Sequence, residues 1–323
     1  MSELMFLKLI NRTLNYGSKK EIFGHADRYL LSTFGNVIRF NLEDGFPVMT
    51  SRKTPWKSAI SEMLWYVEGT NDCATLTRDK NIRVWEDWAA PYHNKKYGTN
   101  YTVQEWKELV MQGVIETEVL PLHYGNMTNK KFIRVTDRDT RGSKVYVEGV
   151  EDYLDQTKFV IDGMKKTPFR KSFHVDMWQS ETVYAQADYC GNESVVLPAC
   201  WYAHTLNYND GKLNMSVLGR SWDVWLAGAW NIAQYAALLH MYAHCLKLPV
   251  GEIEFYTTDC HLYSNLLTQT KEQLNRQSYP FPKLTIKDRG QQYLQDFVID
   301  DFIVEGYKSY PALKGQITVV GGY

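Results

Sequence analysis

The chain has 323 residues, of which 44% are hydrophobic and 14% aromatic, so it can bury a sizeable core as one large domain or two small ones. Its formal net charge of −1 argues against a dedicated nucleic-acid-binding or membrane-surface protein. Five cysteines without paired spacing suit a reducing cytoplasm better than a disulfide scaffold, and no apolar run reaches transmembrane length. We therefore expect a cytoplasmic globular protein without a membrane or nucleic-acid partner.

The N-terminal third alternates between helical and extended patterns. Residues 4–16 have apolar side chains at helical spacing and predict an amphipathic helix, whereas the polar residues 17–32 predict irregular structure. Residues 32–42 alternate and predict a strand, and residues 56–69 predict an amphipathic helix. Glu62 lies among the apolar positions of that helix. Such a carboxylate either snorkels to the surface or is a buried acid with a raised pKa.

The second half contains a hairpin and a long apolar helix. Residues 136–149 predict an exposed hairpin, 150–166 an amphipathic helix and 172–177 a strand. The alternating runs 204–208 and 212–218 meet at Asp210-Gly211, which is a strong hairpin signal. Residues 231–246 are apolar and free of Pro and Gly, which predicts a buried helix opened by Asn231. Cys200 then lies where a turn leads into a strand. A lone cysteine is usually a small buried hydrophobe, but a thiol there can also have a lowered pKa and act as a nucleophile.

Four motifs, the first of which contains Cys200, occur in a fixed order and favour the nucleophile over the buried hydrophobe. They are Leu197-Pro198-Ala199-Cys200, Arg220-Ser221-Trp222-Asp223, Asn231-Ile232-Ala233-Gln234-Tyr235-Ala236 and Asp259-Cys260-His261-Leu262-Tyr263-Ser264-Asn265. Together they resemble the thymidylate synthase family, whose members transfer a one-carbon unit from methylenetetrahydrofolate to C5 of dUMP. The resemblance covers residues 1–90 and 170–319 well. It implies an α/β (α+β) fold: one domain with a large mixed β-sheet flanked by helices, forming a homodimer through the sheet face.

The resemblance also implies the domain layout. Residues 1–323 form a single catalytic domain. If Leu122-His123-Tyr124-Gly125 matches the family's Pro-Val-Tyr-Gly, residues 90–119 are an insertion, although Tyr97-Gly98 is a rival match. The family chain normally stops near Val319, so residues 320–323 form a short extension that alters the lid over the folate.

Site roles follow from the same resemblance. It implies that Cys200 is the nucleophile, that Arg220 lowers its pKa and binds phosphate with Ser221, and that Asn231 reads the O4/N3–H edge of uracil. The resemblance favours the buried acid at Glu62 and gives it a role in proton transfer. It implies a catalytic role for Tyr124 and ribose binding by His261 and Tyr263. It also implies folate binding by Trp85, Trp88 and Asp223. The alternative is that His261 and Tyr263 are bonded within the core and that the tryptophans simply pack there. No metal is expected.

The phosphate site is the least regular part of the match. The family's mobile loop with its phosphate-binding Arg is absent, and Arg28, or His25 at the ungapped position, takes its place. These residues are equally well read as solvated loop charges. The family's Arg-Arg pair, which reaches the neighbouring subunit's nucleotide, is Arg170-Lys171 here, and Lys keeps the charge without the bidentate fork.

Departures from the family bear on the product. Its His after the nucleophile is Trp201, its Gln before Arg-Ser is Gly219, a strand Gln is Thr205, and its Gly-x-Pro-Phe is Ala227-Gly228-Ala229-Trp230. The first two positions also deviate in the family's hydroxymethylase branch. We therefore expect a dUMP hydroxymethylase that makes 5-hydroxymethyl-dUMP, with thymidylate synthase, making dTMP and dihydrofolate, as the alternative. A catalytically silent nucleotide- or RNA-binding paralogue is a third reading, against which the retained motifs and the absence of basic surplus argue.

Overall fold

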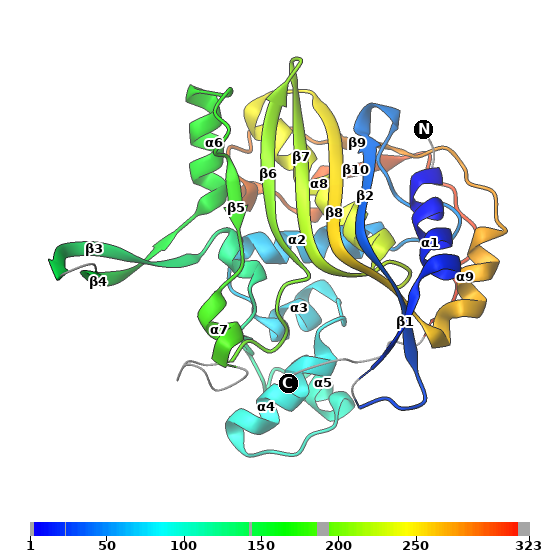
Figure 1. Cartoon of the computed structure of the whole chain (residues 1–323), viewed down its shortest axis with the longest axis horizontal. Coiled ribbons are helices and arrows are strands. Elements are labelled where there is room, and N and C mark those ends of the chain that lie inside the picture. Colours follow the sequence, from blue (N-terminus) through cyan, green and yellow to red (C-terminus); the bar gives the residue numbers. More distant parts are fainter. Residues whose placement is uncertain (1–2, 23, 142–143, 186–193, 316–323) are drawn as a thin grey trace.

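The computed structural model describes residues 3–22, 24–141, 144–185 and 194–315. Its centre is a six-stranded sheet in which β7 and β8 are parallel and the other neighbours antiparallel. The strand order is β1 (Ser18–Glu21), β2 (Tyr29–Asn41), β8 (Val250–Tyr263), β7 (Lys212–Asp223), β6 (Trp201–Asn209) and β5 (His174–Asp176). Helices α2 (Trp56–Glu68) and α8 (Gly228–Leu246) lie behind this sheet (Figure 1). The large mixed sheet flanked by helices confirms the expected fold class.

The β6–β7 hairpin forms where the sequence predicts it. Asp210 and Gly211 both have positive φ angles, of 50° and 75°, as a two-residue turn with the twist of a hairpin requires. Glycine adopts this conformation freely and aspartate tolerates it, so these two residues close the strands locally. The hairpin positions Cys200, which immediately precedes β6, beside Arg220 near the end of β7, whose N–H donates to the Cys200 carbonyl.

Helices α2 and α8 supply much of the core. Most residues of α8 are buried, as expected for a helix that is apolar on nearly all sides. It links the parallel strands β7 and β8 and begins at Gly228, so the prediction that Asn231 opens it is wrong: Asn231 lies at the end of the first turn. Helix α2 ends at Gly69, whose φ of 76° is the left-handed conformation of a helix C-cap.

The N-terminal segment is more regular than predicted. Helix α1 (Leu4–Tyr16) confirms the predicted bounds. The expectation that residues 17–32 are irregular is wrong, because β1 pairs with the beginning of β2, Ser18 opposite Ser32 and Glu21 opposite Tyr29. β1 is exposed along its length, so its residues lack the apolar alternation that reveals a half-buried strand.

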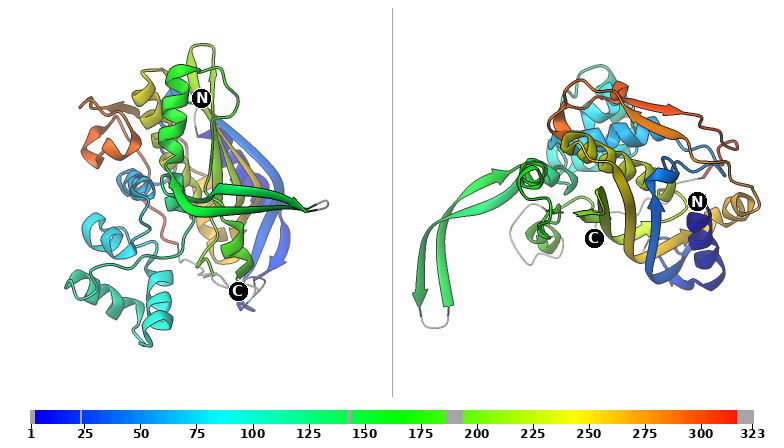
Figure 2. Two further views of the ribbon diagram at one scale, coloured as in Figure 1. Left: turned by 90° about the vertical axis from the view of Figure 1, so that its left-hand side faces the viewer. Right: turned by 90° about the horizontal axis from the view of Figure 1, so that it is seen from above.

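A long two-stranded arm projects from the body (Figures 1 and 2). It consists of β3 (Lys130–Arg141) and β4 (Lys144–Leu154), which confirms the exposed hairpin and extends it. The predicted start of a helix at residue 150 is wrong, because those residues continue β4 and α6 spans Gln156–Lys166. Four apolar side chains share one face of the arm according to its pairing register, and each is about half exposed: Ile133, Val135, Val145 and Val147.

Smaller elements complete the body. They are α3 (Cys73–Lys80), α4 (Glu86–Tyr97), α5 (Val103–Met111), α7 (Ser180–Tyr184), α9 (Leu267–Leu274), β9 (Lys283–Ile286) and β10 (Phe302–Glu305). Residues 90–119 include most of α4 and all of α5, and their status as an insertion stays a prediction. The extension 320–323 lies outside the described residues. None of the helices in the described ranges is both long and apolar enough to cross a membrane.

Candidate active site

Cys200 lies immediately before β6, and two predicted site residues hold its turn. The backbone N–H of Cys200 donates to the Tyr124 hydroxyl at 3.1 Å. The Arg220 guanidinium donates from Nε to the Ala199 carbonyl (3.1 Å) and from Nη2 to the Pro198 carbonyl (2.7 Å). Tyr97, the rival of Tyr124, is 57% exposed and packs against His93. The structure therefore brings Tyr124 and Arg220 to Cys200.

The electrostatic setting of Cys200 differs from the expectation of a lowered pKa. Burial raises the pKa of the Cys200 thiol, the Arg220 guanidinium lowers it, and Asp223 adds to the rise. The pKa of the Cys200 thiol therefore lies above its ordinary value, and the expectation of a lowered pKa is wrong. The physical reason is that burial of the thiol outweighs the effect of a single cation.

Glu62 is buried, as predicted, and accepts four hydrogen bonds, one of them from the Tyr66 side chain. Trp85 Nε1 donates to Oε1 at 2.8 Å, while Trp230 Nε1 (2.6 Å) and Gln234 Nε2 (2.7 Å) donate to Oε2. Burial raises the pKa of the Glu62 carboxyl, and the donors oppose that rise. Asn231 Nδ2 donates to Gln234 Oε1 at 3.0 Å, so one chain of hydrogen bonds joins Asn231 to Glu62.

Two further buried tyrosines, Tyr66 and Tyr235, lie next to residues of the site. The rings of Tyr66 and Tyr124 stack with centroids 4.3 Å apart. Burial raises the pKa of the Tyr235 hydroxyl, and both Cys200 and Glu62 add to the rise. Within the described ranges, the buried Tyr235 hydroxyl finds no hydrogen-bond partner. A bound base or water would satisfy it.

A second polar cluster forms where the ends of β7 and β8 lie side by side. In the parallel register Ser221 is opposite Asp259, and Asp223 is opposite His261. The Asp259 carboxylate contacts His261 Nδ1 at 2.8 Å and accepts from Ser32 Oγ at 2.7 Å and Lys20 Nζ at 2.5 Å. Burial raises the pKa of Asp259, but the His261, Lys20 and Ser32 contacts outweigh it and hold the pKa well below the ordinary range. His261 is thereby oriented, and Tyr263 packs edge-on against it.

The predicted phosphate residues are dispersed. Arg28 lies in the turn between β1 and β2, with Nε 3.5 Å from the Asp27 carboxylate. Arg170 and Lys171 are exposed in the loop between α6 and β5. That loop meets the sheet at Phe173, whose carbonyl accepts a hydrogen bond from the N–H of Leu206. Leu206 is six residues beyond Cys200, so the loop reaches β6 roughly 20 Å from Cys200.

The chemistry of the donor set is compatible with a reduced pterin. The rings of Trp85 and Trp88 lie 5.6 Å apart, and in the described part of the chain the buried Trp88 Nε1 lacks a hydrogen-bond partner. Burial raises the pKa of Asp223, whose Oδ1 accepts from the N–H of Leu226. An indole donor and a carboxyl group suit a heterocycle that offers both acceptors and N–H groups. No cluster of three His, Cys, Asp or Glu side chains suited to a metal occurs among the described residues.

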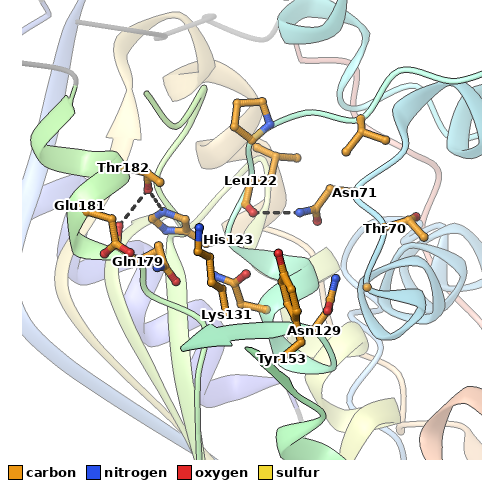
Figure 3. A pocket seen from close by; sticks show the side chains of 14 residues that line it. Thr70, Asn71, Leu122, His123, Asn129, Lys131, Tyr153, Gln179, Glu181 and Thr182 are labelled. Carbon is orange, nitrogen blue, oxygen red and sulfur yellow. Dashed lines mark hydrogen bonds between the residues drawn. The ribbon is translucent and has the colours of Figure 1, made fainter. Parts of the chain in front are cut away.

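A separate cavity of about 400 Å³, with both polar and apolar lining residues, lies beyond His123 (Figure 3). The base of the arm and α7 contribute Lys131, Tyr153 and Thr182 to its lining. His123 borders it through a 2.9 Å hydrogen bond from Nε2 to Thr182 Oγ1, while Nδ1 lies 3.5 Å from the N–H of Ala199. His123 therefore separates this cavity from the Cys200 turn.

Sequence reasoning missed several residues of the site. The sequence assigns no role to five residues that the structure places in the site: Lys20, Asp259, Trp230, Gln234 and Tyr235. The first four make the hydrogen bonds described above, and the hydroxyl of Tyr235 is buried without a partner in the described ranges. Three of them lie inside the recognised motifs, which was the available signal. Trp230 was noted as a departure, and only the pairing of β1 with β2 brings Lys20 to Asp259.

The sheet presents Cys200 and Arg220, and helix α2 adds the buried carboxyl group of Glu62, a set of groups suited to a transferase with a cysteine nucleophile. A family model described as thymidylate synthase matches residues 4–319. A relative named thymidylate synthase, from Listeria innocua, is 29% identical over 302 residues, which cover 90% of this chain and 92% of the relative. The chain belongs to the thymidylate synthase family. Methylenetetrahydrofolate is the co-substrate of this family's reaction.

Proposed function

We propose that this protein transfers a one-carbon unit to C5 of dUMP and lets water capture the product methylene, giving 5-hydroxymethyl-dUMP. The observation that carries the transfer is the arrangement of Cys200 between Arg220 and Tyr124, with Glu62 reached through Gln234 and Asn231. The observation that favours water is the joint replacement of the family's His and Gln by Trp201 and Gly219, which removes an imidazole and a side-chain amide from these two positions.

The reaction begins at the thiol. Cys200 Sγ adds to C6 of the uracil ring, and the displaced electron pair makes C5 a nucleophile. Arg220 opposes the effect of burial on the pKa of Cys200 and so favours the thiolate. Methylenetetrahydrofolate supplies the one-carbon unit at the oxidation level of formaldehyde. Glu62, a buried carboxylate with a raised pKa, is suited to exchange protons with water near the ring.

The two products diverge at the methylene on C5. C5 attacks the methylene carbon of the folate, and loss of the C5 proton then breaks the bond from that carbon to the folate nitrogen, which releases tetrahydrofolate and leaves an exocyclic methylene on C5. Water adds to this methylene, Glu62 accepts a proton from that water, and the C6–S bond breaks to return the thiolate. If tetrahydrofolate instead transfers a hydride to the same carbon, the products are thymidylate and dihydrofolate. The name of the Listeria relative favours this second outcome, so thymidylate synthase is the alternative function.

Binding roles complete the proposal. Arg220 and Ser221 bind the phosphate, Asn231 the uracil edge, and His261 and Tyr263 the ribose, while Trp85, Trp88 and Asp223 hold the folate. Arg170 and Lys171 are exposed at the far end of β6, which supports a homodimer in which they serve the partner's phosphate site. Lys20 and Arg28 are the local candidates for replacing the missing loop Arg.

The deciding experiment is product analysis after incubation with dUMP and methylenetetrahydrofolate. A hydroxymethyl adduct without the absorbance of dihydrofolate supports our proposal. A methyl adduct with dihydrofolate makes the protein a divergent thymidylate synthase. Exchange of the dUMP C5 proton with solvent, abolished in Cys200→Ser, distinguishes both enzymes from a silent nucleotide- or RNA-binding paralogue, which shows no exchange.

A further inference from the structure

An asparagine amide alone does not choose between uracil and cytosine. Uracil presents N3–H as a donor and O4 as an acceptor, whereas cytosine presents N3 as an acceptor and its amino group as a donor. The Asn side chain carries an oxygen and an NH₂ group, so a half-turn of the amide suits it to either base. Selectivity at Asn231 therefore requires something that fixes the direction of its amide.

The hydrogen bonds around Glu62 fix that direction. The indoles of Trp85 and Trp230 can only donate, and both donate to Glu62, at 2.8 and 2.6 Å. A carboxylate held by such donors is itself an acceptor, so the contact at 2.7 Å must come from the NH₂ end of Gln234. The oxygen end of Gln234 then faces Asn231 and accepts from Asn231 Nδ2 at 3.0 Å.

Gln234 has no freedom to reverse. Its side chain is 1% exposed, and its two ends are occupied by groups of opposite polarity. Reversing it would place its oxygen against a carboxylate oxygen and its NH₂ group against the Asn231 NH₂ group, which loses two hydrogen bonds in a buried site. The polarity of Glu62 is thus transmitted over two side chains to Asn231.

We infer that Gln234 is a positioning residue that makes the site selective for uracil by locking the Asn231 amide with Oδ1 presented to N3–H. This inference rests on the proposed pyrimidine site at Asn231. With one Nδ2 hydrogen donated to Gln234, the other reaches O4 of uracil, and a cytosine meets a donor opposite its amino group and an acceptor opposite N3.

The test is the affinity for dUMP and dCMP, measured by calorimetry without folate. The wild-type protein should prefer dUMP by about 10- to 100-fold, the usual discrimination of a bidentate amide–base contact. Gln234→Met keeps the volume but removes both polar ends, and its preference should fall to within about threefold. Gln234→Glu retains an oxygen for Asn231 and, with a proton shared with Glu62, should keep the preference. Gln273→Met, at another fully buried glutamine whose Nε2 donates to Ser51, is the matched control and should also keep it.

A probe on the ligand side is independent of how the variants fold. The 2-pyrimidinone deoxynucleotide presents the N3 lone pair and no 4-substituent, so the locked wild-type site should bind it as weakly as dCMP. Binding of this probe as tight as that of dUMP would overturn the inference, as would an unchanged dUMP preference in folded Gln234→Met or a wild-type preference for dCMP. A wild-type protein that binds no pyrimidine nucleotide would instead overturn the proposed function.

Discussion

The ring of Trp201 occupies the space that any side chain on Gly219 would need. A Cβ atom at Gly219 would lie 2.6 Å from Cε3 and Cζ3 of Trp201, its partner across the β6–β7 pair. Trp201 is 1% exposed and packs against Trp222, Tyr235 and Phe255. The two departures from the family pattern are therefore one change, because the large ring at position 201 requires the absence of a side chain at 219.

This pairing predicts a strong coupling in stability. Gly219→Ala should lower the free energy of unfolding by about 1–3 kcal/mol, since the added methyl overlaps a buried ring. In a Trp201→Leu background the same change should cost much less, and a double-mutant cycle by chemical denaturation measures the difference. Ser216→Ala, on the same strand and half-buried, is the control. Additive effects of the two changes would contradict the coupling.

The raised pKa of Cys200 predicts slow alkylation near neutral pH. The rate of modification by iodoacetamide, followed on the Cys200 peptide by mass spectrometry, should rise with pH through a midpoint above the ordinary thiol value of about 8.5. Arg220→Met removes the group that lowers this pKa, so the midpoint should move higher still. Arg39→Met, at an exposed ion pair with Glu254, should leave it unchanged. A wild-type midpoint below pH 8 would disprove the prediction.

Glu62→Gln should remove catalysis without removing nucleotide binding. Loss of a group that exchanges protons in the reaction typically costs about 10²- to 10⁴-fold in kcat. In the wild type the carboxyl loses its charge as pH falls through its raised pKa, so the acid limb of kcat should lie above pH 4.5. The variant should lack that limb, and its Kd for dUMP, measured by calorimetry, should rise far less than its kcat falls, since the change also affects the contact that orients Gln234. Equal pH profiles would exclude Glu62 from proton transfer.

Buried neutral histidines predict sensitivity to acid. Burial lowers the pKa of His204 to about 3 and that of His240 to about 4. The unfolded chain takes up these protons near pH 6.5, and the folded chain does not until pH 3–4, so the free energy of unfolding falls as pH drops across this window. Each histidine contributes about 1.4 kcal/mol per pH unit there.

His204 offers a direct check of this slope. His204→Gln should reduce the dependence of the free energy of unfolding on pH between 6 and 4, measured by urea denaturation, by the contribution of one histidine. Tyr242→Phe removes the hydroxyl that bonds His204 Nε2 at 3.0 Å and keeps the titrating ring, so it should preserve the slope. Parallel curves for His204→Gln and the wild type would contradict the assignment.

The sequence predicts those features that depend on local spacing. The bounds of α1 and the β6–β7 hairpin follow from periodicity and from one Asp-Gly turn. Periodicity leaves Glu62 open between surface and core, and only the family resemblance favours its burial. β1 and the end of β4 escape prediction because exposed strands need no apolar alternation. The raised pKa of Cys200 escapes it as well, since burial of the thiol depends on segments distant in the sequence.

The same distinction applies within the site. The motifs identify Cys200, Arg220 and Asn231 because these residues fall in recognisable patterns. Which amide end of Gln234 faces Glu62 depends on Trp85 and Trp230, which approach from separate elements. Lys20 reaches Asp259 across more than two hundred positions of chain, a proximity that no local pattern encodes.

The arm formed by β3 and β4 leaves and re-enters the body at one place, because Lys130 is paired with Leu154. Its strands contact each other far more than they contact the rest of the molecule, and a two-stranded ribbon of this kind adds little stability of its own. The arm is therefore a detachable module. Evolution can lengthen or shorten the arm without changing the contacts of the catalytic body. For the same reason, residues 132–152 can be replaced with an Asn-Gly turn, or a foreign peptide can be inserted at the tip of the arm.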